Sequence, residues 1–253
     1  MKVLKDEPTE EAVVKLKFLG TRANIEATTR RHRRHSSLEV SYCGKRVMID
    51  CGADWRGELA ELRPQAIVIT HAHPDHAFGL EDGATCPVYA TRAAWNQLSD
   101  YPVAEKRVLS SERPLEIMGM EFGAFTLEHS TLAPAVGYRI AAGRATIFYA
   151  PDVVYIHEHQ SALQGVDLYV GDGATLDRSL VRRSGESLVG HTPIRTQLTW
   201  CEKEGVPRAI FTHCGSQIVK GDERRLGARL RHMAEERGVQ AKFAHDGMEL
   251  VLR

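Results

Sequence analysis

The sequence predicts an α/β (α+β) protein in which mixed β-sheets are covered by helices. Short apolar segments rich in β-branched residues recur in both halves of the chain, and segments with helical spacing lie between them. No internal repeat and no low-complexity linker divides the 253 residues. We therefore expect a single domain that spans residues 1–253.

The expected strands are short, and several end at a glycine or a polar residue. They cover residues 12–20, 65–70, 120–129, 135–143, 144–152, 165–173 and 207–213. Residues 38–52 are expected to form a hairpin that turns at Gly44 and Lys45. Residues 240–252 resemble two further strands joined at an Asp-Gly turn.

Two segments have the spacing of amphipathic helices. In residues 192–205, Thr192 is the expected N-cap and Gly205 ends the helix. Residues 222–238 form the second expected helix, closed by Gly238.

Composition limits the classes of partner. The chain has 33 basic and 33 acidic residues, so its bulk charge gives no reason to expect attraction to nucleic acid or to an anionic membrane. The five cysteines are odd in number and form no CxxC pair, which is typical of reduced thiols in the cytoplasm. The N-terminal segment has no signal-peptide core, and no apolar run is long enough to span a bilayer. We expect a cytoplasmic protein.

A cluster of metal-binding residue types follows the expected strand 65–70, in the sequence THAHPDH. His71 and His73 are two residues apart and point the same way in an extended segment. Pro74 then breaks the strand, which allows Asp75 and His76 to face the same cavity. Four ligands exceed what one catalytic metal needs, so two metals that share a bridging ligand are the simpler interpretation. The alternative is a solvated turn that happens to be rich in histidine.

Three more residues of these types each stand at the end of an expected strand: His129, Asp152 and His213. A single histidine there would more often be an ordinary surface or core residue. Because sites are often built from loops at one edge of a sheet, the three together indicate further ligands for the same site.

These motifs resemble those of the metallo-β-lactamase-fold hydrolases. The order THAHPDH, His129, Asp152, His213 matches theirs, and so does Asp50 in VMIDCG. The resemblance implies an αββα sandwich of two mixed sheets with helices outside. LEHSTLAPAVGYRI and GHTPIRTQL resemble segments of the phosphoribosyl 1,2-cyclic phosphodiesterases of phosphonate breakdown. Ribonuclease Z has the same metal motifs and a segment like RRHRRHSS, and the pyrroloquinoline quinone biosynthesis B proteins have one like VGDGATL.

The resemblance also implies how the ligands would be divided between the metals. His71, His73 and His129 would bind the first ion, Asp75, His76 and His213 the second, and Asp152 both. Asp50 would orient the cluster by hydrogen bonds. The ions would be zinc or manganese, and the same ligands accept iron.

His191 and Asp75 are the catalytic residues that the resemblance indicates. His191 would act beside the metals as a general acid or contact a phosphate, and the alternative is a residue that merely precedes a helix.

The sequence departs from two of these relatives. The cyclic phosphodiesterases carry an early group of cysteines and a late histidine for a structural zinc, whereas here the cysteines are missing and Ser216 replaces the histidine. We therefore expect no structural zinc. The long tRNA-clamping insertion of ribonuclease Z is missing as well, which makes tRNA processing less favoured.

Other polar segments allow two interpretations. The run RRHRRH (30–35) could form an anion-binding rim in which Arg33, Arg34 and Ser36 contact a substrate phosphate, or a solvated loop whose arginines pair with surface acids. His157 and His159 have the spacing of metal ligands, but we interpret them as surface residues.

The favoured function is hydrolysis of a small or cyclic phosphodiester by a hydroxide held between two divalent ions. The alternatives are a lactone or thioester hydrolase and a cofactor-biosynthesis protein on the same site. The expected partner is a small phosphorylated substrate, with nucleic acid not favoured and no membrane, and a homodimer is the default assembly.

Overall fold

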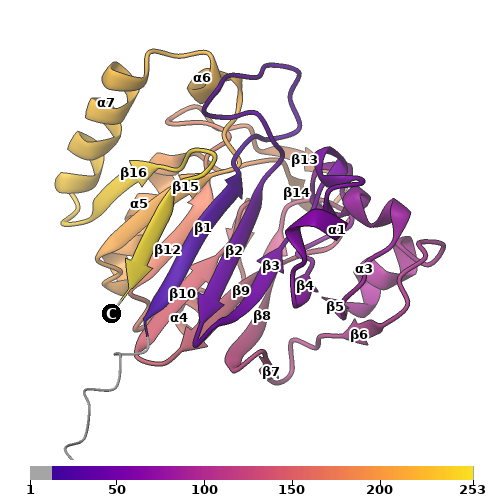
Figure 1. Ribbon diagram of the computed structural model, residues 1–253. Helices are drawn as coiled ribbons and strands as arrows, with labels where there is room; N and C mark the ends of the chain where they lie inside the picture. Colours follow the sequence, from indigo (N-terminus) through magenta and orange to yellow (C-terminus); the bar gives the residue numbers. More distant parts are fainter. Residues whose placement is uncertain (1–12, 253) are drawn as a thin grey trace, which may run out of the picture.

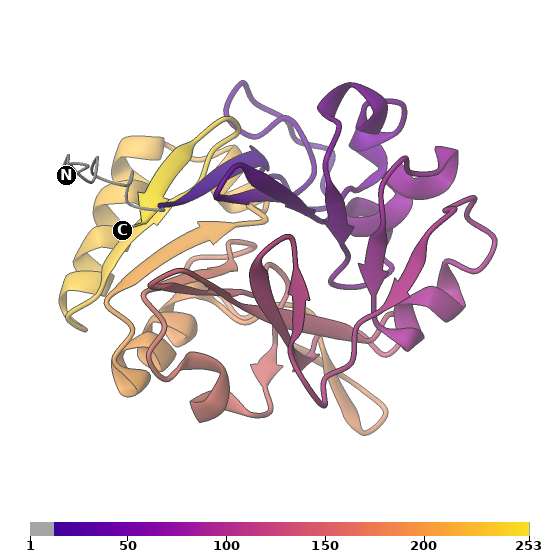
Figure 2. The ribbon, with the colours of Figure 1, turned by 60° about the horizontal axis from the view of Figure 1, so that its bottom comes forward.

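The computed structural model describes residues 13–252 and places two β-sheets face to face, with helices on the outer faces (Figures 1 and 2). This is the predicted αββα sandwich. Residues 1–12 lie outside the described residues, and with them most of the N-terminal segment that was expected to hold no signal peptide and Ala12 of the first expected strand. No helix within residues 13–252 is long and apolar enough to cross a membrane.

The first sheet is built from the N-terminal part of the chain and one C-terminal strand. Its order is β17 (Glu249–Leu252), β1 (Val14–Gly20), β2 (Ser37–Tyr42), β3 (Lys45–Ile49), β4 (Ala66–Val68), β5 (Val88–Ala90) and β6 (Lys106–Val108). The strands from β17 to β3 are antiparallel, and those from β3 to β6 are parallel.

The second sheet repeats this division. Its order is β11 (Tyr155–Ile156), β8 (Met120–Glu128), β9 (Ala135–Ala142), β10 (Ala145–Tyr149), β12 (Leu168–Asp172), β15 (Arg208–Thr212) and β16 (Gln240–Phe243), and β7 (Leu115–Ile117) also pairs with β8. The strands from β11 to β10 are antiparallel, and those from β10 to β16 are parallel. A separate hairpin contains β13 (Arg182–Ser184) and β14 (Ser187–Val189).

Helices cover both outer faces. The first sheet is covered by η1 (Ala53–Trp55), α1 (Leu59–Leu62), α2 (Pro74–Ala77), η2 (Phe78–Asp82) and α3 (Arg92–Gln97). The second is covered by α4 (His159–Leu163), α5 (Ile194–Glu204) and α7 (Glu223–Glu235), and the short α6 (Ser216–Val219) follows β15.

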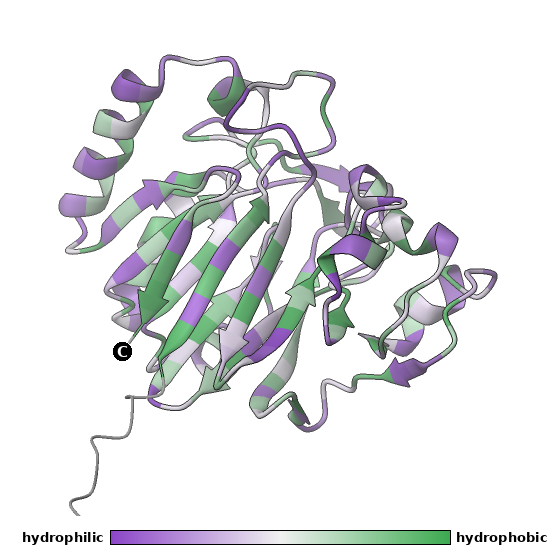
Figure 3. Ribbon diagram, in the orientation of Figure 1, coloured by the Kyte–Doolittle hydropathy of each residue, from purple (hydrophilic) through white to green (hydrophobic). Residues whose placement is uncertain are grey.

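Three apolar clusters correspond to these layers. Between the sheets, buried residues such as Leu16 and Val40 pack with Tyr138 and Ile147 from the opposite sheet. The other faces of the strands pack against the helices, as when Met48 shares a cluster with Trp55 and Trp95. Figure 3 shows the resulting alternation of apolar and polar residues along the strands. Burial on both faces explains why the central strands read as nearly continuous apolar runs.

The two strands and the Asp-Gly turn predicted over residues 240–252 are present, but the two strands do not pair with each other. β16 pairs with β15 in the second sheet, whereas β17 pairs with β1 in the first. Gly247 does turn the chain, with a φ of 79°, but the turn carries the chain from one sheet to the other. Two apolar runs around an Asp-Gly turn look the same locally in both cases, and only the pairing partners differ.

Two predicted details at element ends also differ. The β2–β3 turn is centred on Cys43 and Gly44, whose φ values are 48° and 72°, and not on Gly44 and Lys45. A two-residue turn of this type needs positive φ at both central residues. Cys43 and Gly44 have positive φ, so the turn lies one residue closer to the N-terminus than predicted. The predicted N-cap Thr192 does not cap α5: Pro193 occupies that position without a side-chain cap, while Gly205 ends the helix in a left-handed conformation as predicted.

A buried hydrogen bond joins the two sheets beside the end of β4. The Tyr138 hydroxyl donates to the carbonyl of Ile69 at 2.6 Å, and the backbone N–H of Val136 donates to the carbonyl of Thr70 at 3.2 Å. These contacts hold the chain immediately before His71 against the opposite sheet.

We predict that Tyr138→Phe lowers the free energy of unfolding by about 1–3 kcal/mol, because it leaves the buried Ile69 carbonyl unpaired. Tyr149→Phe is the matched control, since the Tyr149 hydroxyl is equally buried but has no hydrogen-bond partner among the described residues. Urea unfolding of both variants measures the difference. Equal losses in the two variants would contradict a specific role for the Tyr138 bond.

Candidate metal centre

The predicted ligands lie where strands of both sheets end. In the first sheet, Asp50 follows β3, and the THAHPDH segment follows β4. In the second sheet, His129 follows β8 and His213 follows β15, while Asp152 lies shortly after β10. Because the parallel strands of each sheet present their carboxyl ends at one edge, segments far apart in the sequence converge there.

The loop after β4 has the predicted conformation. His73 is extended, with φ −72° and ψ 154°, and Pro74 is the first residue of α2. Proline suits this position because its N–H would be unpaired in any case and its φ is already that of a helix. Asp75 and His76 therefore lie in the first turn of α2, where both side chains belong to the cluster of predicted ligands.

A buried carboxylate orders this loop. Asp50 Oδ1 accepts a hydrogen bond from the Thr70 backbone N–H at 2.8 Å, and both of its carboxylate oxygens lie within reach of the Thr70 hydroxyl. Asp50 Oδ2 lies 2.8 Å from His76 Nδ1, and the Thr70 hydroxyl lies 3.0 Å from His71 Nδ1. Both histidines thus have Nδ1 engaged, so their Nε2 atoms are left for a metal.

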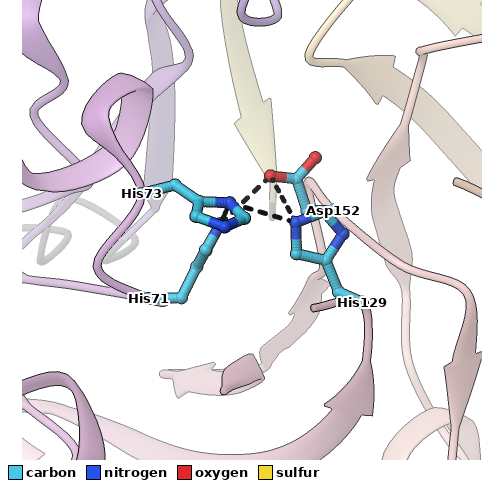
Figure 4. Close-up of side chains that lie close together, drawn as sticks. All are labelled: His71, His73, His129 and Asp152. Atoms are coloured by element: carbon cyan, nitrogen blue, oxygen red, sulfur yellow. Dashed lines mark hydrogen bonds and ion pairs between the residues drawn. The ribbon is translucent and has the colours of Figure 1, made fainter. Parts of the chain in front are cut away.

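The structure brings all seven predicted ligands together in two sets. One set is His71, His73, His129 and Asp152; the other is Asp75, His76, Asp152 and His213. Within each set the candidate ligand atoms lie within 4.8 Å of one another. Figure 4 shows the first set, in which the imidazole nitrogens face the Asp152 carboxylate. Asp152 is the residue that the two sets share.

The distances from Asp152 to its neighbours agree with a position shared by the two ligand sets. Its Oδ2 lies 2.8 Å from His76 Nε2 and 3.3 Å from His71 Nε2, and its Oδ1 lies 2.8 Å from His213 Nδ1. Although these distances are short, His76 Nε2, Asp152 Oδ1 and His213 Nδ1 have no partner among the described residues with the geometry of a hydrogen bond. Buried polar atoms are rarely left unpaired, so this donor set fits metal ions.

The protonation of the first set favours metal binding. Burial and the neighbouring histidine His129 lower the pKa of His73 to about 4, and burial also lowers the pKa of His71 and of His129. A histidine must be neutral to bind a metal, so these three are ready to do so near neutral pH.

The second set is rich in negative charge. Burial by itself lowers the pKa of His76, but the carboxylates of Asp75, Asp152 and Asp50 outweigh burial and raise it to about 10. Burial disfavours the charged form of Asp75, yet His76 and His213 hold the pKa of Asp75 well below its usual range. The carboxylates therefore require positive charge beside them, which divalent ions would supply.

Asp172 belongs to this site and was missed in the sequence. Its Oδ2 lies 2.8 Å from His191 Nδ1 and accepts a hydrogen bond from the Val153 backbone N–H at 3.1 Å. Burial lowers the pKa of His191, but Asp172 and Asp152 outweigh burial and raise it. The sequence contained a signal for Asp172. It ends the apolar strand β12 just before a glycine, and several of the predicted ligands also stand at the ends of apolar strands.

The cluster opens into a cavity of about 680 Å³. His73, Asp75, His129, Asp152, His191 and His213 line it. Arg178 and Arg182 lie in its wall together with the apolar side chains of Leu132 and Leu180. Neither arginine has an ion-pair partner among residues 13–252. Asp50, His71 and His76 lie beneath this surface and are fully buried.

Arg33, Arg34 and Ser36, predicted to contact phosphate, do not line this cavity. Arg34 Nη2 pairs with Glu58 Oε2 at 3.2 Å, and its guanidinium lies 4.7 Å from the Trp55 ring centroid. Ser36 is buried, and Arg33 is exposed. For Arg34 the structure shows the alternative interpretation, an arginine paired with a surface acid.

His157 and His159 lie outside both ligand sets. His157 Nε2 is 3.6 Å from Glu128 Oε1, and His159 Nδ1 is 3.2 Å from Glu204 Oε1. His157 is exposed, as predicted, whereas only 12% of the His159 side chain is exposed, so the prediction that His159 is a surface residue is wrong.

Curated relatives of this chain include ribonucleases. The chain is 28% identical over 200 residues to "Ribonuclease Z" of Methanopyrus kandleri, an alignment that covers 66% of this chain and 70% of that protein. It is 39% identical over 70 residues to "Ribonuclease Z" of Bradyrhizobium diazoefficiens, covering 26% of this chain. That second alignment spans only 22% of the Bradyrhizobium protein.

Solved structures with this fold cover nearly the whole chain. The metallo-β-lactamase fold protein YhfI from Bacillus subtilis has a TM-score of 0.73 at 16% identity, over 96% of this chain and 100% of that one. Zn²⁺-bound PqqB from Methylobacterium extorquens has a TM-score of 0.73 at 20% identity, over 94% and 100%. A diphosphatase from the PhnP family has a TM-score of 0.69 at 21% identity, over 95% and 97%.

A comparison of the sequence with protein families agrees with the fold and with the position of the predicted ligands. The profile described as "Beta-lactamase superfamily domain" matches residues 45–214, which include all seven predicted ligands. The chain therefore belongs to the β-lactamase superfamily.

Proposed function

We propose that this chain is a dinuclear metal-dependent phosphodiesterase that hydrolyses a small or cyclic phosphodiester. The observation that carries the proposal is the pair of four-residue ligand sets that share Asp152 and open into a cavity with two unpaired arginines. A metal pair suits this reaction because it can offset charge on both the attacking and the leaving oxygen. A cavity of about 680 Å³ is of the size that holds a small molecule.

His71, His73 and His129 would hold one ion, Asp75, His76 and His213 the other, and Asp152 both. When bound, the ions would supply Lewis-acid activation of a water molecule and of the phosphate. Zinc and manganese suit these ligands, and iron is accepted by the same set.

The side chains of the cavity have separate tasks in this proposal. Asp75 would accept a hydrogen bond from the attacking water, which it can reach because it lines the cavity. His191 would give a proton to the leaving oxygen, while Asp172 holds its Nδ1 at 2.8 Å and so sets the ring orientation. Asp172 is therefore a positioning residue.

Arg178 and Arg182 replace Arg33, Arg34 and Ser36 as the proposed phosphate contacts. Both line the cavity, and guanidinium groups bind phosphate oxygens in pairs of hydrogen bonds. Arg182 begins the β13–β14 hairpin and pairs with Val189, and the next residue, Gly190, donates its N–H to the His129 carbonyl at 2.9 Å. The hairpin thus holds its charge beside the metal ligands.

A nuclease is the second candidate, favoured by the curated relatives named ribonuclease Z. Both candidates cleave phosphodiesters and would share the first test. Metal-free protein is loaded separately with manganese and with zinc, and hydrolysis of bis(p-nitrophenyl) phosphate is measured. Metal-dependent release of nitrophenol supports the proposal, and a panel of cyclic diesters and RNA then separates the candidates. No release from protein that carries two ions would favour lactone, thioester or oxidative chemistry.

We predict that Asp152→Ala binds less than half of the metal that the unaltered protein holds, because both ligand sets lose their shared member. Metal content after gel filtration, measured by mass spectrometry, checks this. Asp177→Ala is the control, since this carboxylate pairs with Arg229 at 2.6 Å and lies outside the ligand sets. Two tightly held ions in Asp152→Ala would contradict the bridge.

We predict that His191→Ala keeps its metal and loses about 10²–10⁴-fold in kcat for diesters with poor leaving groups. The loss should shrink for p-nitrophenyl esters, whose leaving group needs no proton. Asp172→Asn should show the same dependence on leaving group in a weaker form. A loss that is equal for all leaving groups would identify His191 as a binding residue instead.

We predict that Arg178→Ala and Arg182→Ala raise KM about 5–30-fold for an anionic diester, since one or two kcal/mol of binding is lost. Arg33→Ala is the matched control, because its side chain is exposed and away from the cavity. Steady-state kinetics on all three variants measure the effect. An equal rise in KM for Arg33→Ala would contradict this assignment and would favour the arginine run at residues 30–35 as the phosphate contact.

A further inference from the structure

A second hollow lies beside the metal cavity, across α6. Its volume is about 860 Å³, and it is formed by residues 29–32, the end of α6, the start of α7, the end of β16, and Ala244, His245 and Met248. The two hollows are lined by successive parts of the same two segments. Residues 23–25 and 215–217 line the metal cavity, and residues 29–32 with Ile218, Val219 and Gly221 line the second hollow. Figure 1 shows this region at the top of the molecule, where the loop before β2 meets α6 and α7.

The second hollow carries an excess of positive charge. Its lining contains five arginine and lysine residues, namely Arg30, Arg31, Arg224, Arg231 and Lys242. Glu223 is the one acidic residue among them, and it pairs with Arg31 at 3.0 Å. The other four have no acidic partner among the described residues. Because the chain as a whole has equal numbers of basic and acidic residues, this excess is local.

Helix α7 contributes two of these charges from one face. Arg224 and Arg231 are seven residues apart, so they lie on the same side of the helix with Gly227 between them, and all three line the hollow. The Arg231 guanidinium lies close to Gly227, where a Cβ atom would come 3.4 Å from Arg231 Nη1. Arg225 lies on the same helix but does not line the hollow.

Below this charged rim the lining is apolar. Ile218, Val219, Leu226, Phe243 and Met248 form it. Leu226 and Phe243 are partly exposed, so they present apolar surface to a ligand. A ligand that matches the whole hollow would therefore need several negative charges and a flat apolar or aromatic group.

We propose that the second hollow binds a nucleoside polyphosphate, with the phosphates on Arg224, Arg231 and Lys242 and the base against Phe243 and Leu226. Guanidinium groups bind phosphate oxygens in pairs of hydrogen bonds, and aromatic rings stack on bases. The volume is within the range of pockets for molecules of this size. The apolar floor favours a single nucleotide over a nucleic-acid strand, which needs an extended charged groove. This site is separate from the metal centre and does not depend on its chemistry.

The test uses α,β-methylene ADP, whose P–C–P linkage resists hydrolysis, and the metal-loaded full chain. Isothermal titration calorimetry should show binding that weakens at least about tenfold in Arg231→Ala, a loss of about 1.4 kcal/mol. Arg225→Ala is the matched control and should bind as the unaltered protein does. Both side chains are exposed, so neither change should affect folding. Arg231→Lys should recover part of the affinity if charge is what the ligand recognises.

Four outcomes would overturn the proposal. They are no binding, equal weakening in Arg231→Ala and Arg225→Ala, affinity for pyrophosphate equal to that for the nucleotide, and displacement by single-stranded oligonucleotides that strengthens with their length. Competition between the nucleotide and bis(p-nitrophenyl) phosphate, with binding intact in Arg231→Ala, would place the nucleotide in the metal cavity and would also overturn it. Because the readout is binding, failure of the proposed hydrolase activity does not affect it.

Discussion

The candidate metal centre is held together by the hydrogen bonds of the buried Asp50 carboxylate. Asp50 has no exposed surface, and a charge in that position is tolerated only if it is fully paired. Its partners are the Thr70 backbone, the Thr70 hydroxyl and His76 Nδ1, so that one residue holds both ends of the ligand loop. Asp50 itself has a φ of 62°, an uncommon conformation for a residue other than glycine, which the surrounding bonds maintain.

Close packing around the loop limits its freedom further. A side chain on Gly52 would come within 2.1 Å of the Asp75 carbonyl, and one on Gly79 within 2.6 Å of the Cys51 carbonyl. The segment after β3 therefore lies directly against the loop that carries Asp75. The Tyr138 hydroxyl, from the other sheet, donates a hydrogen bond to the carbonyl of Ile69, the residue before Thr70. Ligands from both sheets are fixed relative to one another because the sheets are joined at the point where the ligands emerge.

Charge is distributed unevenly over a chain whose total is balanced. Carboxylates and histidines concentrate at the candidate metal centre. Arginines without an ion-pair partner among residues 13–252 lie in the wall of the metal cavity and in the second hollow. The run at residues 30–35 is divided: Arg31 lines the second hollow, whereas Arg34 pairs with Glu58 and lines neither hollow. Two negatively charged ligands could thus be accommodated on opposite sides of α6, at sites with different chemistry.

Local patterns in the sequence were sufficient for the fold class, most strands and the identity of the clustered side chains. A buried strand that ends in a ligand-type residue is a feature of a few consecutive positions, so His71, His129 and His213 could be recognised one segment at a time. Which sheet β16 and β17 would join could not be read in this way, because pairing depends on partners far away in the sequence. For the same reason only the folded chain showed that Asp172 supports His191, that Arg34 turns to Glu58, and that Arg178 and Arg182 reach the cavity. The type of a residue determines which reactions and contacts its side chain can take part in. Its neighbours, which only the tertiary structure supplies, determine which of those reactions and contacts are possible at its position.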